Sequence, residues 1–146
     1  MSDEHREPPQ VDPRLVEAFL ASLKRCLGMP GFMETFYESF VSSSEEVREK
    51  FRNTDLQRQA RMLSDSLHVL AVAVQGRAGS PAWGDLPRLA ERHSRKDLDI
   101  RPPLYDHWLA CLIDTARQHD PLFTPEIEAA WRATLSVGIT YMKVRY

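Results

Sequence analysis

The chain has 146 residues, of which 42% are hydrophobic and 27% are charged, and its formal net charge is −2. This length suits one domain with a substantial core and is too short for two catalytic domains. The charge is near zero and no basic block occurs, so nothing favours binding to nucleic acid or to an acidic membrane surface. The longest apolar stretch, residues 67–74, falls far short of the ~20 residues of a membrane span. Two cysteines cannot build a disulfide framework or a four-ligand zinc site.

The amino-terminal segment is charged and contains prolines, and it lacks the apolar run of a secretory signal. It predicts a disordered lead over residues 1–11, followed by a single domain over residues 12–146. Without a leader or a membrane span, the sequence is typical of a cytoplasmic protein.

Helix signals follow one another along the domain. Asp12 before Pro13 predicts a helix start, and apolar residues then recur every three to four positions until Gly28. A second amphipathic helix is expected from near Gly31 to the serines at 42–44.

Two capping-box patterns come next, Ser43 with Glu46 and Thr54 with Gln57. The first predicts a short helix that reaches Phe51, and the second predicts a longer helix with one apolar stripe. Two helix starts in quick succession imply a corner in the chain.

The second half of the chain has the same character. Glycines and a proline in residues 76–84 predict a loop, after which Asp85 and Pro87 open a short helix. Two longer helices follow, one beginning near Pro102 and one capped by Thr124. No segment alternates like a strand, so the sequence predicts an all-α domain of seven or eight helices.

One histidine interrupts an apolar face. His93 ends the predicted short helix, on the stripe that carries Leu86, Leu89 and Ala90, where a buried surface normally has a hydrocarbon. An imidazole in this place is either a core histidine with a satisfied hydrogen bond or an axial ligand of a cofactor.

A second polar residue lies inside an apolar stripe, because Gln59 faces inward on the long helix before the predicted loop. Gln59 and His93 can therefore face each other across a gap, with Tyr37 and Phe51 at its rim. An imidazole on one wall and hydrogen-bond donors on the other suit haem and a gaseous ligand.

Each of these residues also has a purely structural interpretation. Tyr37 can be a tyrosine at the edge of the core whose hydroxyl reaches a backbone carbonyl. Gln59 can turn outward if its helix is slightly rotated. Phe51, Leu63 and Trp108 can be core residues that touch only protein.

Six stretches carry a resemblance to a known family: Thr35–Phe40, Glu46–Phe51, Gln59–Leu63, Leu89–His93, Ile100–Tyr105 and Ala130–Trp131. In their order and spacing the chain resembles the globins, most closely the bacterial single-domain globins and the globin domains of flavohaemoglobins. The resemblance extends from about Asp12 to the end of the chain.

The resemblance implies a globin fold, with helices arranged three over three around a pocket for haem b. It implies that His93 is the proximal iron ligand and that Phe51 packs flat on the porphyrin. It also implies that Tyr37, Gln59 and Leu63 form the distal ligand pocket. The positions that would contact the haem are Phe51, Leu63, Ile100, Tyr105, Trp108 and Leu135.

Three departures from the family pattern limit which functional properties of the family we expect in this chain. Flavohaemoglobins place a glutamate from the last helix near the proximal histidine, and the comparable position here falls at or close to Tyr146. Tyr105 is retained, but without the acid we expect His93 to be less imidazolate-like and less suited to peroxide chemistry. Met62 stands where many globins carry a basic residue toward a haem propionate. The 146 residues leave no room for a flavin or nicotinamide domain beside the globin domain, so we expect redox cycling to require an external reductase.

The expected function is reversible binding of dioxygen and other diatomic gases, for storage, scavenging or sensing through a signalling partner. Nitric oxide dioxygenation with a separate reductase is one alternative, and enzyme activity is expected only in that case. A globin-fold signalling or interaction module that has lost haem is the other alternative. The presence of His93, Phe51 and Tyr37 together argues against a haem-free module.

Overall fold

The computed structural model of the protein describes residues 11–75 and 81–146, and these residues form seven α-helices joined by turns. The helices are α1 (Pro13–Leu27), α2 (Phe32–Ser42), α3 (Glu45–Lys50), α4 (Leu56–Gln75), α5 (Pro81–His93), α6 (Pro102–His119) and α7 (Pro125–Val144). The predicted all-α class is confirmed. The lead predicted over residues 1–11 lies outside the described residues except for Val11, which packs against the core.

Helix starts follow the local chemistry of the sequence. Asp12 caps α1 by accepting a hydrogen bond from the backbone N–H of Arg14, and Pro13 takes the first helical position. Thr124 caps α7 in the same way through the N–H of Ile127. Both starts were predicted at these residues.

The other two predicted caps are wrong by one residue. Ser44, not Ser43, caps α3, and the hydroxyl of Ser43 instead donates to the carbonyl of Phe40 at 2.6 Å. Asp55, not Thr54, caps α4 by accepting from the N–H groups of the residues two and three positions ahead. In each case two neighbouring residues can cap, and the turn geometry selects the second.

The predicted loop over residues 76–84 is partly wrong. Helix α5 begins at Pro81, four residues before the expected start at Asp85, and it continues through Pro87. Proline is compatible with the first turn of a helix, so Pro81 starts this helix where the pattern suggested a loop. Residues 76–80 lie outside the described part of the chain.

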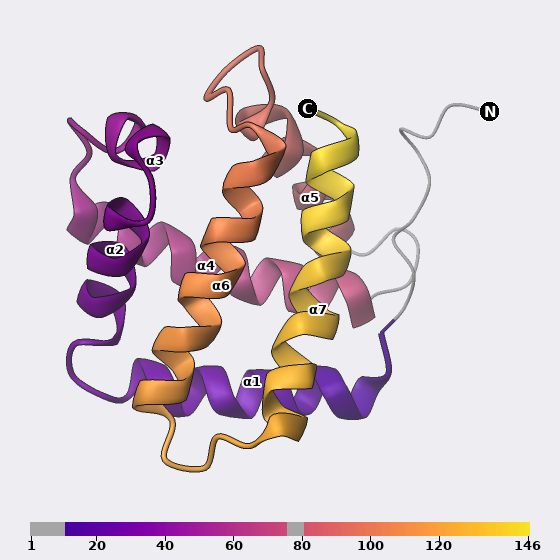
Figure 1. Ribbon diagram of the computed structural model, residues 1–146. Coiled ribbons are helices and arrows are strands. Elements are labelled where there is room, and N and C mark those ends of the chain that lie inside the picture. The colour runs from indigo at the N-terminus through magenta and orange to yellow at the C-terminus, as the bar shows by residue number, and fades with distance from the viewer. Residues whose placement is uncertain (1–10, 76–80) are drawn as a thin grey trace.

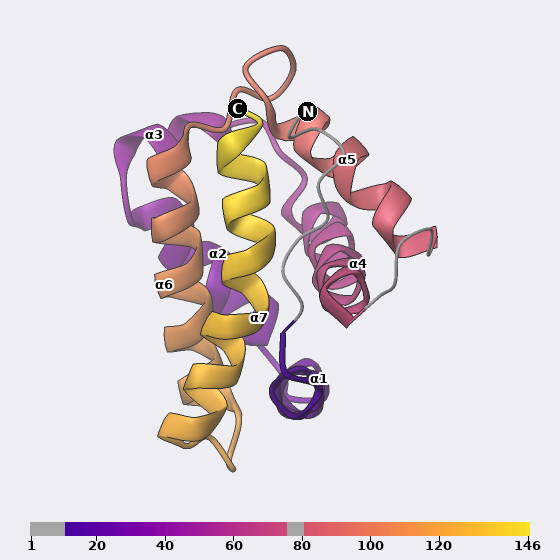
Figure 2. The same cartoon turned by 90° about the vertical axis from the view of Figure 1, so that its right-hand side faces the viewer.

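The helices pack in crossing layers. Figures 1 and 2 show α6 and α7 running side by side, with α4 and α5 on one side of them and α1 crossing below. Helix α2 packs against α6, and α4 contacts both α5 and α7. Helices α4, α5, α6 and α7 carry most of the predicted site residues: Gln59 and Leu63 on α4, His93 at the end of α5, Tyr105 and Trp108 on α6, and Leu135 on α7.

Helices α4 and α7 approach closely at Gly138, which is buried in α7. A Cβ atom at this position would lie 2.4 Å from Cδ2 of Leu70 on α4. The glycine therefore sets how near α7 can come to the helix that carries Gln59 and Leu63.

No helix among the described residues is both long enough and apolar enough to cross a bilayer.

Candidate functional site

Tyr37 is almost fully buried on α2, and its hydroxyl donates a hydrogen bond to the backbone carbonyl of Gln59 on α4 at 3.1 Å. Burial raises the pKa of the Tyr37 phenol well above its ordinary value, although the side-chain amide of Gln59 opposes this effect. The phenol therefore keeps its proton and acts as a hydrogen-bond donor. This contact also fits the structural interpretation of Tyr37, in which the hydroxyl serves a backbone carbonyl.

Phe51 follows the last residue of α3 and is half-buried against Tyr37 and Phe40. Its ring centroid lies 6.0 Å from that of Tyr37 and 5.7 Å from that of Phe40, both in edge-to-face arrangements. The structure thus brings Tyr37, Gln59 and Phe51 together into one group.

His93 is half-buried at the end of α5, and its Nδ1 lies 2.8 Å from the carbonyl oxygen of Leu89, one turn earlier. A carbonyl only accepts hydrogen bonds, so a neutral imidazole must carry its proton on Nδ1 and keep a lone pair on Nε2. Burial lowers the pKa of His93, an effect that the Leu89 bond only partly offsets. The ring is therefore a neutral base at neutral pH.

Two other described histidines make the same bond to the carbonyl four residues earlier, so this bond by itself does not distinguish His93. His68 is exposed on α4 and bonds to the carbonyl of Ser64, whereas His119 bonds to that of Thr115 and packs on Phe32. The two half-buried rings differ in the kind of neighbour: a tyrosine, Tyr105, lies beside His93 with ring centroids 6.5 Å apart, whereas the neighbour of His119 is a phenylalanine at 5.6 Å.

Tyr105 is buried on α6, and burial raises the pKa of its phenol to about 12. Ile100 is half-buried, and its N–H donates to the carbonyl of His93 at 2.9 Å. His93, Ile100 and Tyr105 therefore form a second group, supplied by the end of α5, the following loop and α6.

The remaining predicted lining residues belong to the apolar core. Leu63 and Leu135 are buried, on α4 and α7 respectively, and Trp108 on α6 is half-buried against the same core. Met62, noted for its place in the family pattern, is exposed.

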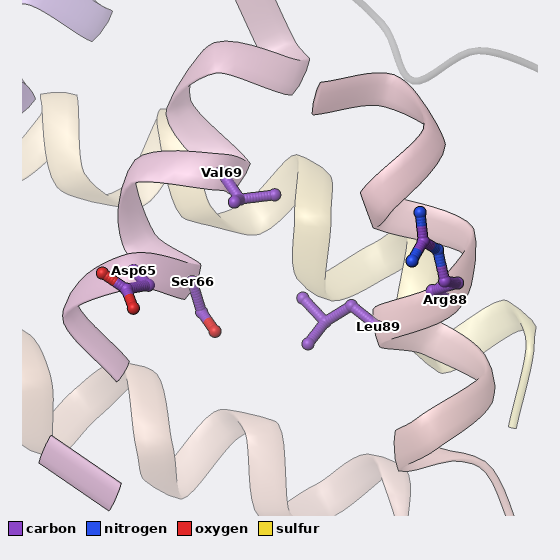
Figure 3. Close-up of a pocket in the computed structure, with 5 residues that line it drawn as sticks. All are labelled: Asp65, Ser66, Val69, Arg88 and Leu89. Atoms are coloured by element: carbon purple, nitrogen blue, oxygen red, sulfur yellow. The ribbon is translucent and has the colours of Figure 1, made fainter. Parts of the chain in front are cut away.

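A cavity of about 250 Å³ lies between α4 and α5. Asp65, Ser66 and Val69 line it from α4, and Arg88 and Leu89 line it from α5. Figure 3 shows Leu89 extending from α5 into the space toward α4. Leu89, whose carbonyl accepts the hydrogen bond from His93, therefore also lines this pocket.

The loop after His93 is tied to the end of the chain. The hydroxyl of Tyr146 donates to the carboxylate of Asp99, and its carbonyl accepts from the N–H of Arg95 at 3.1 Å. The sequence comparison placed Tyr146 at or near the position of a family glutamate. In this structure the residue binds the loop rather than supplying an acid.

Two features of the site were missed by sequence reasoning. Leu89 could have been found, because a histidine in the last turn of a helix readily bonds to the carbonyl four residues back. Asp99 gave no comparable signal, since nothing in the pattern around it requires the left-handed backbone that it adopts.

Two comparisons with known proteins found matches to this chain. The family model for globins matches residues 29–142. The chain is also similar to the crystal structure of protein PA3967 from Pseudomonas aeruginosa PAO1, which is described as structurally highly homologous to a human haemoglobin. The two chains are 35% identical with a TM-score of 0.85, over 90% of this chain and 98% of the other. None of the curated proteins compared with the chain matches it.

The family match covers most of the chain, and the structural match covers nearly all of both proteins. The predicted globin fold and the predicted likeness to bacterial globins are therefore confirmed, and the chain belongs to the globin family.

Proposed function

We propose that this globin binds haem b through His93 and reversibly binds dioxygen and related diatomic gases at the haem iron. The observation that carries the proposal is the neutral, half-buried imidazole of His93, whose Nδ1 proton is donated to the carbonyl of Leu89. That bond fixes the tautomer and leaves Nε2 as the metal-ligating atom.

The residues around His93 fit a haem in their chemistry. A neutral imidazole is a good ligand for iron, and a second-shell bond from its other nitrogen to a carbonyl raises its basicity. The side chains that would contact the porphyrin are apolar or aromatic, as a large flat hydrophobic group requires. We assign this role to Phe51, Leu63, Ile100, Tyr105, Trp108 and Leu135.

Haem, when bound, would supply the iron at which a gas ligand is held. We assign Tyr37 to the distal side of the haem, where it would offer a phenolic proton that burial keeps in place. Gln59 offers side-chain amide donors from the same group. Both can donate to a gas that acquires partial negative charge.

Hydrogen bonds to a charged acceptor stabilise it by ~1.5–3 kcal/mol each, so two donors would slow ligand release by orders of magnitude. Tyr37 and Gln59 together would therefore favour retention of oxygen over rapid delivery. The likeness to a protein described as homologous in structure to a human haemoglobin supports the proposal that this chain binds haem.

The test is to titrate the purified chain with haemin and record the visible spectrum. We expect saturable binding with a strong Soret band, and reversible spectral changes as oxygen is admitted to and removed from the reduced protein. His93→Ala should abolish histidine ligation of the iron.

His68→Ala and His119→Ala are matched controls, because both rings make the same bond to the carbonyl four residues earlier. Their spectra should equal that of the wild type. A histidine-ligated spectrum that survives in His93→Ala, or disappears in His68→Ala, would show that His93 is not the ligand. If the wild type shows no Soret band, the correct interpretation is a globin-fold signalling or interaction module without haem.

A further inference from the structure

The loop between α5 and α6 closes over the end of α5 through three backbone hydrogen bonds. The N–H groups of Leu98, Asp99 and Ile100 donate to the carbonyls of Arg92, Ser94 and His93 at 3.0, 2.9 and 2.9 Å. Carbonyls at the end of a helix have no partner within the helix, so this loop satisfies the turn that carries His93.

Asp99 is the residue at which the loop reverses. It is the one non-glycine residue with positive φ in the described part of the chain, at +53°. A left-handed backbone is unfavourable for most L-residues, and aspartate tolerates it better than most of them. Such a residue persists only where its surroundings hold it in place.

Three contacts hold the side of the loop that carries Asp99. Its carboxylate accepts a hydrogen bond from the hydroxyl of Tyr146, at the end of the chain. The same carboxylate lies 3.9 Å from the ammonium group of Lys50, which also donates to the carbonyl of Leu98 at 3.1 Å. Lys50 is the last residue of α3 and precedes Phe51.

Tyr146 makes two further contacts with the loop, both with Arg95. Its carbonyl accepts from the N–H of Arg95, and the Arg95 guanidinium lies over its ring, 4.9 Å from the centroid. Figures 1 and 2 both show the loop beside the carboxyl end of α7, with α3 near the same end of the molecule.

Asp99 therefore joins three elements: the corner that carries Phe51, the loop that completes the turn of His93, and the end of α7. We propose that Asp99 is a positioning residue for His93, holding the loop closed so that the imidazole keeps its place relative to the corner that carries Phe51. This inference rests on the proposed haem function, because the place of His93 matters only toward a bound group.

The test compares Asp99→Gly with Tyr146→Phe in the full-length protein. Glycine keeps the left-handed backbone but removes the carboxylate, so it isolates the side-chain contacts from backbone strain. Phenylalanine keeps the ring beneath Arg95 and removes only the hydroxyl. Asp99→Asn is the conservative rescue, since its amide oxygen still accepts from Tyr146 and asparagine tolerates positive φ.

Lys143→Met is the matched control, because it breaks a different surface lysine–aspartate pair, the 2.8 Å contact between Lys143 on α7 and Asp106 on α6. The first measurement is amide hydrogen exchange of Leu98 and Ile100. Asp99→Gly and Tyr146→Phe should each raise the exchange rate of these two amides at least about fivefold, which corresponds to the loss of one net hydrogen bond. Asp99→Asn and Lys143→Met should stay near the wild-type rate.

The second measurement addresses the position of His93 in the haem-loaded protein. The iron–histidine stretching frequency should shift, and the rate of haem transfer to excess apomyoglobin should rise, in Asp99→Gly and Tyr146→Phe only. Unchanged amide exchange would show that Asp99 does not hold the loop. Faster exchange with an unchanged stretching frequency and haem loss would show that the loop does not position His93. Either result overturns the proposal.

The failure of haem binding itself is distinguishable from the failure of this proposal. If the wild type takes up no haem, the proposed function is wrong, and exchange of the His93 Nδ1 proton can be measured in the unloaded chain. Asp99→Gly should then speed exchange of that proton, and an unchanged rate would overturn the positioning role as well.

Discussion

The hydroxyl of Tyr37 on α2 donates its hydrogen bond to the backbone carbonyl of Gln59 on α4, at 3.1 Å. A phenol has one proton, so donating to a gas ligand requires Tyr37 to share or give up the bond to this carbonyl. A gas ligand at the proposed haem would therefore compete with the Gln59 carbonyl for this proton, while the bond keeps the tyrosine ring oriented.

Tyr37→Phe should raise the oxygen dissociation rate by about tenfold or more, because a hydrogen bond to a partly charged acceptor is lost. Carbon monoxide is less polar when bound, so its dissociation rate should change less. Laser photolysis and stopped-flow mixing of the haem-loaded protein measure both rates. Equal effects on the two gases would mean that the tyrosine acts by packing and not by donating a proton.

Gln59→Leu separates the side chain of Gln59 from its backbone. The substitution removes the amide donors but leaves the carbonyl that receives the Tyr37 bond, so the orientation of Tyr37 should be kept. The oxygen dissociation rate should rise by about tenfold or more, because the lost hydrogen bond is to the same partly charged acceptor. An oxygen dissociation rate equal to that of the wild type would indicate that the Gln59 side chain points away from the ligand.

The fold was largely predictable because its signals are local. Asp12 with Pro13 and Thr124 with its following proline fix two helix starts through chemistry that involves only neighbouring residues. The starts of α3 and α4 were misplaced because adjacent residues compete to cap, and the pattern alone does not rank them. The start of α5 was missed because proline and glycine at its beginning resemble a loop.

The candidate site residues were chosen from the sequence pattern, but the contacts among them could not be predicted from it. His93 and Gln59 stand out as polar residues in apolar stripes, which periodicity detects. The bond from Tyr37 goes to a backbone carbonyl, which every residue possesses, so no residue type signals it. The ties of Asp99 to Lys50 and Tyr146 join residues 49 and 47 positions apart, beyond the reach of any local pattern.

Asp120, at the end of α6, should make stability depend on pH. Burial alone raises its pKa, but hydrogen bonds from Arg25, Ser22 and the N–H of Leu122 outweigh that effect and leave the pKa below its ordinary value. A carboxyl group with a lowered pKa in the folded state contributes stability above its unfolded pKa. That contribution is lost as the pH falls below about 4.

Asp120→Asn should therefore lower the free energy of unfolding by about 2–3 kcal/mol at pH 7, because it leaves Arg25 without its charged partner. The difference from the wild type should shrink as the pH approaches 3. Urea unfolding of both proteins, in the same state of haem loading, measures this difference. Asp114→Asn, which breaks an exposed pair with Arg117, is the control and should have little effect at either pH. A difference for Asp120→Asn that does not change with pH would contradict this role of the carboxylate.

Gly138 should be required for the close approach of α7 to α4. In Gly138→Ala the new methyl group would meet Leu70, which is only 2% exposed and cannot move into solvent. Overpacking of this kind costs ~1–3 kcal/mol, whereas alanine in a helix interior gains ~1 kcal/mol over glycine. We expect a net loss of stability in the wild-type background, with α4 displaced from α7.

The Leu70→Ala background removes the clash between the new methyl group and Leu70, so it tests directly whether that clash causes the loss of stability. There Gly138→Ala should be neutral or stabilising relative to Leu70→Ala alone, giving a coupling energy of about 1 kcal/mol or more between the two positions. Gly28→Ala is the control, because a methyl group there meets only ordinary contacts at 3.5 Å. Its effect on the free energy of unfolding should be the same in both backgrounds. If Gly138→Ala cost the same with and without Leu70, the spacing between α4 and α7 would not be set by this contact. The placement of Gln59 and Leu63 on α4 would then have to depend on other residues.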